Sequence, residues 1–247
     1  MKNRIIMPAI LSLLFISSLT AADFWEEKPF PEWSQKECAK LLADSPWAHP
    51  YAMTGAVIPG MMRAPGRDAP SRSFGDDSLA SQTGDREVHV FLQFRFLTAK
   101  PVKAAIGRMR MLSAPGNKDL EQQVNSYVEQ DSGPEIVVEV TYYSEPSGHW
   151  ALRRVEGFLN KSTLESIHNK VWLGGSSTNK RVTLSRYQGP SDNYPGALLY
   201  FPRNDEDGNP HFDGTGNNIL LHMETDFGEV DLLMDPEKMR FDQDFTF

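Results

Sequence analysis

Residues 87–97 read EVHVFLQFRFL, and this stretch decides the fold. Its apolar residues recur at every second position and so share one face of an extended chain: Val88, Val90, Leu92, Phe94 and Phe96. Alternation of this kind, rich in valine and phenylalanine, is typical of a strand with one buried face. We therefore predict a core strand here.

Two helices and a second strand are predicted directly after this strand. Pro101 suits the first turn of a helix, and the apolar residues behind it share one helical face. Asn117 is placed to cap the N-terminus of the next helix. Glu135–Tyr143 then alternates again. The resulting strand–helix–helix–strand unit can bury a core, but it contains no recognisable catalytic motif.

The second half of the chain is expected to be mainly β-structure. Ser162 and Glu165 suggest a capping box, with a helical face continuing to Val171. Residues 181–187 alternate weakly, and three later segments read as short strands: 197–201, 218–224 and 229–234. Phe227-Gly228 is the predicted turn between the last two. The predicted fold class is α+β, with mostly antiparallel sheet, two or three short helices, an N-terminal helical arm and a flexible linker.

The first 22 residues have the pattern of a cleaved signal peptide. Lys2 and Arg4 precede an apolar run, and Thr20-Ala21-Ala22 offers small residues for cleavage before Asp23. The run of roughly 13 residues is short against the ~20 that a membrane span needs. We expect export to the periplasm or the cell exterior, and no integral membrane segment after cleavage.

The charge of the chain argues against nucleic-acid binding, and its cysteine content rules out an internal disulfide. The formal net charge is -8, and removal of residues 1–22 leaves 23 basic against 33 acidic residues, a balance of -10. Contacts with phosphate groups require clustered lysines and arginines, which a chain this acidic lacks. We therefore predict no nucleic-acid partner. One cysteine, Cys38, allows no internal disulfide. No cofactor is predicted.

Residues 23–51 are predicted to be a tryptophan-rich helical arm. Ser34 and Glu37 form a capping box, and the helix is expected to end near Asp44 because Ser45 precedes a proline. Because so large an aromatic surface is unfavourable in water, we expect the arm to dock on the main body. Residues 52–86 are rich in glycine and proline and are predicted to be a flexible linker, and residues 87–247 the α+β body.

The order of these motifs resembles that of a group of uncharacterised secreted bacterial proteins. The similarity lies in Lys28–Ser34 (KPFPEWS), Ser45–Ala48 (SPWA), Phe94–Met109 and Tyr200–Arg203. In that group a Trp-Ser helix and a Ser-Pro-Trp motif follow the signal peptide, and a variable stretch rich in glycine and arginine comes next. The resemblance covers most of the mature chain and implies an architecture but no chemistry. The linker here is less rich in glycine.

Four tryptophans are the candidate binding residues. Trp33 and Trp47 belong to the arm, where they either pack in cis or pair with another protein. Trp150 and Trp172 are candidates to line a binding face, since aromatic faces hold sugars, peptides and cations. The competing interpretation is that all four pack in the core.

The acidic segment 203–214 invites comparison with a calcium loop. Aligning Gly208 with the glycine of such a loop puts Arg203 at the first ligand position and Gly214 where a bidentate glutamate is required. An acidic hairpin loop explains the composition better. A weak surface cation site remains the second interpretation, with these ligands: Asp205, Asp207 and Asp213. His222 with Glu224, and His211 with Asp213, are spaced two apart, a common chance spacing.

Two classes of function remain open from the sequence, besides a purely structural role. The first is a non-enzymatic binding or protein-interaction module of the cell envelope, with another envelope protein as partner. The second is an envelope hydrolase whose acids or histidines meet only in the folded chain, because no Gly-x-Ser-x-Gly elbow occurs. The second predicts a cleft that holds several titratable groups with perturbed pKa values.

Overall fold

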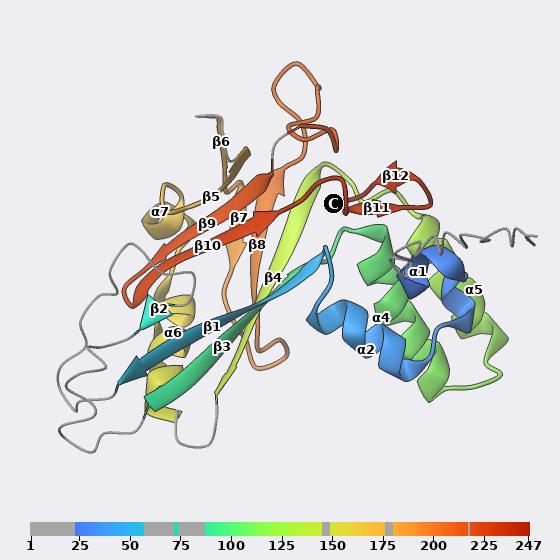
Figure 1. The fold of residues 1–247 in the computed structure, drawn as a ribbon, viewed down its shortest axis with the longest axis horizontal. Helices are drawn as coiled ribbons and strands as arrows, with labels where there is room; N and C mark the ends of the chain where they lie inside the picture. Colours follow the sequence, from blue (N-terminus) through green and yellow to red (C-terminus); the bar gives the residue numbers. More distant parts are fainter. Residues whose placement is uncertain (1–22, 57–71, 74–86, 145–148, 176–179, 217) are drawn as a thin grey trace, which may run out of the picture.

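The computed structural model describes residues 23–56, 72–73, 87–144, 149–175, 180–216 and 218–247. Within these ranges the chain forms a six-stranded sheet, a four-stranded sheet, a small two-stranded sheet and a set of helices around one shared apolar core (Figure 1). The predicted fold class, α+β with mostly antiparallel sheet, is confirmed. The expected signal peptide, residues 1–22, lies outside the described residues.

The larger sheet has six strands in the order β2-β1-β3-β4-β8-β7. Only the β1–β2 pair is parallel among these neighbours. The strands are β1 (Ala48–Ala56), β2 (Arg72–Ser73), β3 (Glu87–Phe96), β4 (Glu135–Ser144), β7 (Arg186–Gln188) and β8 (Ala197–Pro202). The strand predicted from EVHVFLQFRFL is thus β3, and it lies between β1 and β4 with Leu92, Phe94 and Phe96 fully buried.

The smaller sheet has four antiparallel strands in the order β10-β9-β5-β6. They are β5 (Val171–Gly175), β6 (Arg181–Thr183), β9 (Ile219–Thr225) and β10 (Gly228–Met234), and a separate pair follows, β11 (Arg240–Phe241) with β12 (Asp244–Phe245). Hydrogen bonds connect the larger sheet to β10 of the smaller sheet and to the segment that follows β6. The Ser185 backbone nitrogen donates to the Tyr200 carbonyl at 2.8 Å, and the Tyr51 hydroxyl donates to the Glu229 carbonyl at 3.3 Å.

The helices divide into two groups. Figure 1 shows α1, α2, α4 and α5 together beyond one end of the larger sheet. Their bounds, with those of the short 3-10 helix η1 and the second group, are α1 (Phe24–Glu27), η1 (Phe30–Glu32), α2 (Gln35–Ala43), α4 (Lys100–Ser113), α5 (Lys118–Glu129), α6 (His149–Lys161) and α7 (Leu164–Ile167). α6 links the two sheets: the Tyr187 hydroxyl of β7 donates to the Leu159 carbonyl at 2.6 Å, and Phe158 packs edge-on against Phe227 in the β9–β10 turn.

The N-terminal arm docks on the body of its own chain, as expected. Trp33 and Trp47 are both 0% exposed. The Trp47 indole nitrogen donates to the Thr246 carbonyl at 2.9 Å, and the Arg108 side chain of α4 donates to the Trp33 carbonyl at 2.8 Å. Trp47 and Thr246, which are 199 positions apart in the sequence, therefore belong to the same core.

The expected boundary between arm and linker differs from the structure. β1 runs from Ala48 to Ala56 and pairs with β3 along its whole length, so it crosses the predicted end of the arm at Tyr51. A sheet register is a long-range property, and neither Pro50 nor Gly55 in this segment suggests a strand. The end of the arm is therefore part of a strand of the main sheet, between β2 and β3. Most of the predicted linker, 57–71 and 74–86, lies outside the described residues.

Of the two predicted capping boxes, the structure confirms the first and contradicts the second. In α2 the Ser34 hydroxyl accepts from the Glu37 backbone nitrogen and the Glu37 carboxylate accepts from the Ser34 backbone nitrogen, as predicted. The box assigned to Ser162 is wrong: Thr163 is the N-cap of α7, and its partner is Ser166. The helix is also shorter than predicted, because Val171 already belongs to β5.

The helix α6 was not predicted at all, although its sequence carries the signal. Leu152, Val155 and Leu159 recur at intervals of three and four, which is the spacing of one helical face. Val155 and Leu159 are buried. Gly157, which is a poor helix former, lies in the middle of this segment and weakens the helical pattern of the sequence.

The Glu37 carboxylate makes the capping box of α2 sensitive to acid. The ion pair with Lys28 and the hydrogen bonds from Ser34 lower the pKa of Glu37 from 4.5 to about 2. A depressed pKa in the folded state contributes stability above pH 4.5 that is lost as the pH falls toward 2. We expect Glu37→Gln to lower the melting temperature at pH 7 and the two proteins to converge between pH 4.5 and 2. Thermal unfolding at several pH values checks this, and a constant difference at all pH values would contradict it.

Candidate functional site

The smaller sheet has one buried and one outward face. The side chains at alternate positions face the core, for example Val171 and Leu173 of β5 and Leu221 and Met223 of β9, each almost completely buried. The intervening side chains point the other way. We call this surface the open face, formed by Trp172, Arg181, Thr183, Leu220, His222, Glu224, Asp231 and Leu233.

The sheet register aligns four of these residues in one row across all four strands. Thr183 pairs with Trp172, Trp172 with His222, and His222 with Asp231. Side chains directly opposite one another on antiparallel strands stand about 5 Å apart and interact. The row therefore forces an indole, an imidazole and a carboxylate into contact.

The Trp172 indole is held between a cation and an imidazole. Its ring stacks on His222, with centroids 4.9 Å apart and an angle of 24° between the planes. The Arg181 guanidinium lies 4.4 Å from the centroid of the indole. Because β6 and β9 flank β5 on opposite sides, Trp172 lies between these two groups. This arrangement leaves little ring face for stacking a sugar, but it presents the edge of a rigid, preorganised aromatic side chain.

His222 bridges two carboxylates. Its Nδ1 lies 2.6 Å from Asp231 Oδ1, and its Nε2 lies 3.6 Å from Glu224 Oε1. Its side chain is 13% exposed, against 41% for Asp231 and 50% for Glu224. An ionised carboxylate only accepts hydrogen bonds, so Nδ1 is the donor to Asp231. The pair that sequence spacing suggested, His222 with Glu224, does meet, but the shorter contact is with Asp231.

Gly174 makes room for the Trp172 ring. A Cβ at position 174 would lie 2.8 Å from the Lys180 carbonyl oxygen and 3.0 Å from Cζ3 of Trp172. We expect Gly174→Ala to cost about 1–3 kcal/mol of unfolding free energy because the backbone oxygen cannot move cheaply. Denaturant unfolding measures this.

A matched control for that variant lies in α6. A Cβ at Gly157 meets nothing within 4 Å, and alanine is the better helix former, so Gly157→Ala should be neutral or stabilising. Equal destabilisation by the two substitutions would contradict the close approach at Gly174.

The other predicted tryptophans do not join this surface. Trp33 and Trp47 are fully buried in the core between arm and body, which leaves no ring surface for a ligand or a second protein. As candidate binding residues they are therefore corrected to packing residues. Trp150 belongs to α6, but its side chain lies outside the described residues. Of the four candidates, only Trp172 is shown on a solvent-facing surface.

The acidic loop does not assemble as a cation site in the described residues. Asp205 Oδ1 accepts from the backbone nitrogens of Asp207 and Asn209, and Asp213 Oδ1 accepts from the Thr215 backbone and hydroxyl. Each aspartate therefore accepts hydrogen bonds from residues of its own loop, as expected in a tight turn. This agrees with the interpretation of the segment as a hairpin loop. No group of three or more His, Cys, Asp or Glu side chains is placed to hold a metal ion within the described ranges.

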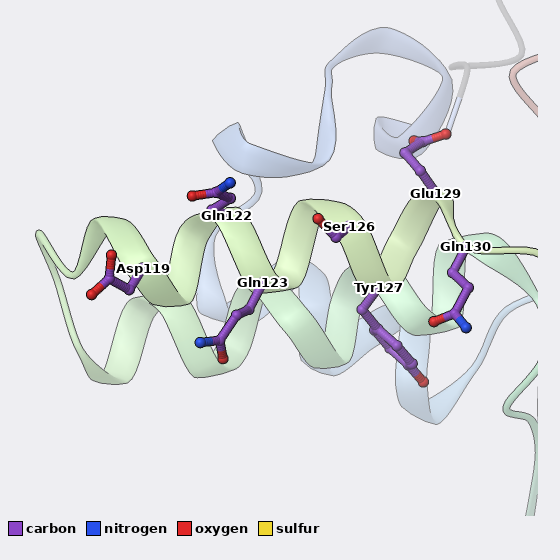
Figure 2. Close-up of a pocket in the computed structure, with 7 residues that line it drawn as sticks. All are labelled: Asp119, Gln122, Gln123, Ser126, Tyr127, Glu129 and Gln130. Atoms are coloured by element: carbon purple, nitrogen blue, oxygen red, sulfur yellow. The ribbon is translucent and has the colours of Figure 1, made fainter.

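A wide, shallow hollow lies on α5. Figure 2 shows its lining residues, all from this helix or its C-terminal end: Asp119, Gln122, Gln123, Ser126, Tyr127, Glu129 and Gln130. Their side chains point in several directions, with Gln122 and Glu129 on one side of the helix and Gln123 and Tyr127 on the other (Figure 2). Glu129 is already paired with Lys100 at 3.0 Å. Side chains that do not converge cannot position a substrate, so this surface is not a candidate site.

The open face contains half of a hydrolytic constellation. An aspartate that orients a histidine through Nδ1 is the supporting pair of many hydrolases. In the described part of the chain, no serine, threonine or cysteine hydrogen-bonds to His222.

Comparison with known proteins adds no assignment. No family model matches the chain, and no curated protein matches it. One solved structure is similar over 59% of this chain and 75% of its own, at 11% identity and a TM-score of 0.37: a crystal structure described as a novel protein of unknown function from Burkholderia pseudomallei. So low a TM-score carries no conclusion. Among the described residues, no helix is both long and apolar enough to cross a membrane.

Proposed function

We propose that this protein is an exported, non-enzymatic interaction module of the cell envelope, and that the open face contacts a protein partner. Export rests on the sequence pattern of residues 1–22. Contact with a protein rests on one observation: the open face combines a rigid tryptophan and an arginine with exposed leucine, inside a charged border. Tryptophan and arginine are the residues most enriched where protein interfaces carry their binding energy.

The composition of the open face supports this proposal in detail. Leu233 is 58% exposed and pairs with Leu220 on the neighbouring strand, one row away from Trp172 and His222. Glu224 and Asp231 form the charged border. An apolar centre with a charged rim is the usual anatomy of a protein interface.

The test is a cross-linking pull-down from the native cell envelope, with mature protein beginning at Asp23 as bait. We expect a stoichiometric protein partner with the wild type and its loss with Trp172→Ala/Arg181→Ala. The matched control, Tyr127→Ala/Arg110→Ala, removes an exposed aromatic residue and an arginine from the helical end of the molecule. Circular dichroism confirms that each bait is folded. No partner for a folded wild type, or full capture by the open-face variant, would overturn the proposal.

The hydrolase remains the second candidate because of the 2.6 Å contact between His222 and Asp231. It requires turnover that disappears in His222→Gln while the fold is kept. A panel of chromogenic ester, phosphate and glycoside substrates tests this directly. Absence of any activity that depends on His222 would remove the candidate.

A further inference from the structure

The open face carries opposite charges on the two sides of Trp172. Figure 1 shows the smaller sheet apart from the helices α1, α2, α4 and α5. The Arg181 guanidinium is exposed and lies over the indole, and no acidic residue of the described chain forms an ion pair with it. Glu224 is 50% exposed, and its ion pair within the described residues is the long contact to His222, at 3.6 Å. Each charge can therefore take an opposite charge from another molecule.

The sheet register places Trp172 midway between these two charges. Arg181 lies on β6 level with Gly174, two residues beyond Trp172. Glu224 lies on β9 level with Lys170, two residues before Trp172, because its backbone nitrogen donates to the Lys170 carbonyl at 2.9 Å. Neighbouring strands are about 4.8 Å apart, and two residues advance about 6.8 Å along a strand. The two charged residues are therefore roughly 17 Å apart in the plane of the sheet, too far for an ion pair within one chain.

Leu233 is the second apolar centre of the open face. Its side chain is 58% exposed, the highest value among the exposed large apolar residues of the described chain. It lies on β10, level with Leu220 and hence with Gly174 on β5. On the same strand spacing, the line from Trp172 to Leu233 is about 12 Å long. This line crosses the line between the two charged residues at its midpoint and at roughly 90°.

From this pattern we infer that the partner of the open face is a second copy of the same chain, related by a two-fold axis along the line from Trp172 to Leu233. Rotation about this axis sets each of the two apolar residues against its own copy. It also exchanges the two charged positions, so Arg181 of each copy meets Glu224 of the other. Such an interface is self-complementary, as a closed dimer requires. The inference rests on the proposed function, because it names the protein that the open face contacts.

The size and charge of this face predict a weak dimer. The strands of the two copies cross at roughly 70°, which is closer to orthogonal than to aligned sheet packing. Four short strands offer only about 400 Å² per copy, against the ~800 Å² per partner of a standard interface. The excess of acidic residues makes two copies repel each other, but physiological salt screens charges that lie beyond about 8 Å. We therefore expect a dissociation constant on the order of 10–100 µM.

The test is sedimentation velocity of the mature protein at physiological salt, over a concentration series that brackets this value. We expect the wild type to shift from monomer to dimer. Arg181→Glu and Glu224→Arg should each weaken association at least roughly tenfold, because each sets like charges against one another twice in the dimer. The double variant Arg181→Glu/Glu224→Arg should regain the wild-type affinity within about threefold, because the exchanged charges meet again across the axis. Circular dichroism confirms that each variant is folded.

A cross-linking experiment tests the position of the axis. Leu233→Cys places a thiol on the axis, where a short bismaleimide should join two copies. The matched control is Tyr127→Cys, an exposed position on α5, which should remain uncrosslinked at the same concentration. Cys38 is 0% exposed, so its thiol does not react in either variant. Equal cross-linking of the two variants would contradict the inferred axis.

The remaining outcomes separate this inference from the proposed function. A wild type that stays monomeric, or a double variant that associates as weakly as the single variants, would overturn the inference. Capture of a different protein by the open face of a monomeric wild type in the pull-down supports the proposed function and overturns the inference. A dimer that captures the native copy of the chain supports both. Absence of both a dimer and a captured protein overturns both.

Discussion

Replacing Trp47 by alanine will lower the free energy of unfolding by about 3–5 kcal/mol, the usual cost of truncating a buried aromatic side chain. The Trp47 ring is 0% exposed and packs edge-on against Trp25 at 5.9 Å. Its indole nitrogen holds the Thr246 carbonyl at 2.9 Å. The substitution therefore loosens the arm and the C-terminal segment together. For a chain of this size the melting temperature should fall by roughly 6–20 °C.

The matched control is the same substitution on the open face. Trp172 is only partly buried, so Trp172→Ala loses a stack and a cation contact but creates no core cavity, and we expect a cost below about 2 kcal/mol. Denaturant unfolding of both variants gives the comparison. Equal effects would mean that Trp47 does not pack as the structure describes. Deletion of residues 23–47 extends the test: unchanged melting would show that the arm does not stabilise the body.

The sequence predicts the elements whose signals are local. The capping box of Ser34 with Glu37 and the N-cap at Asn117, which accepts from the Leu120 backbone nitrogen at 3.0 Å, are both correct. Each depends on side-chain chemistry within one helical turn. Thr163 was missed as a cap because its neighbour Ser162 offers the same chemistry one residue earlier. Side-chain type alone does not distinguish adjacent hydroxyl residues.

The open face cannot be predicted from the sequence, for a different reason. Trp172, His222 and Asp231 are far apart along the chain and meet only through the pairing of β5, β9 and β10. A period of two shows that His222 and Glu224 share a face, but it does not show which strand lies beside them. The sequence pattern continues a helical face to Val171 and predicts no strand at β5, so the strands beside β5 cannot be predicted either.

The second large effect concerns a partly buried ion pair on the face of the larger sheet opposite to Leu92 and Phe94. Glu139 of β4 is 8% exposed, and its carboxylate lies 2.6 Å from the Arg95 guanidinium of β3. The Tyr194 hydroxyl donates to the same carboxylate. Burial and the neighbouring Glu139 raise the pKa of Tyr194, so its hydroxyl stays protonated and keeps donating at alkaline pH. We expect Glu139→Leu to cost about 3–5 kcal/mol, because it leaves a guanidinium and a hydroxyl without their acceptor.

Removing the cation as well should restore part of that loss. Arg95→Met/Glu139→Leu places apolar groups of similar length in the same space, and replacing a buried ion pair in this way is often close to neutral. Some cost persists because the Arg95 Nε also donates to the Leu42 carbonyl at 2.7 Å, at the end of α2. The double variant should therefore lose about 1–3 kcal/mol less unfolding free energy than the sum of the losses in the two single variants. Denaturant unfolding of the wild type, both single variants and the double variant measures this difference. Strictly additive losses would show that the two charges are solvated separately and that Glu139 does not hold β3, β4 and the arm together.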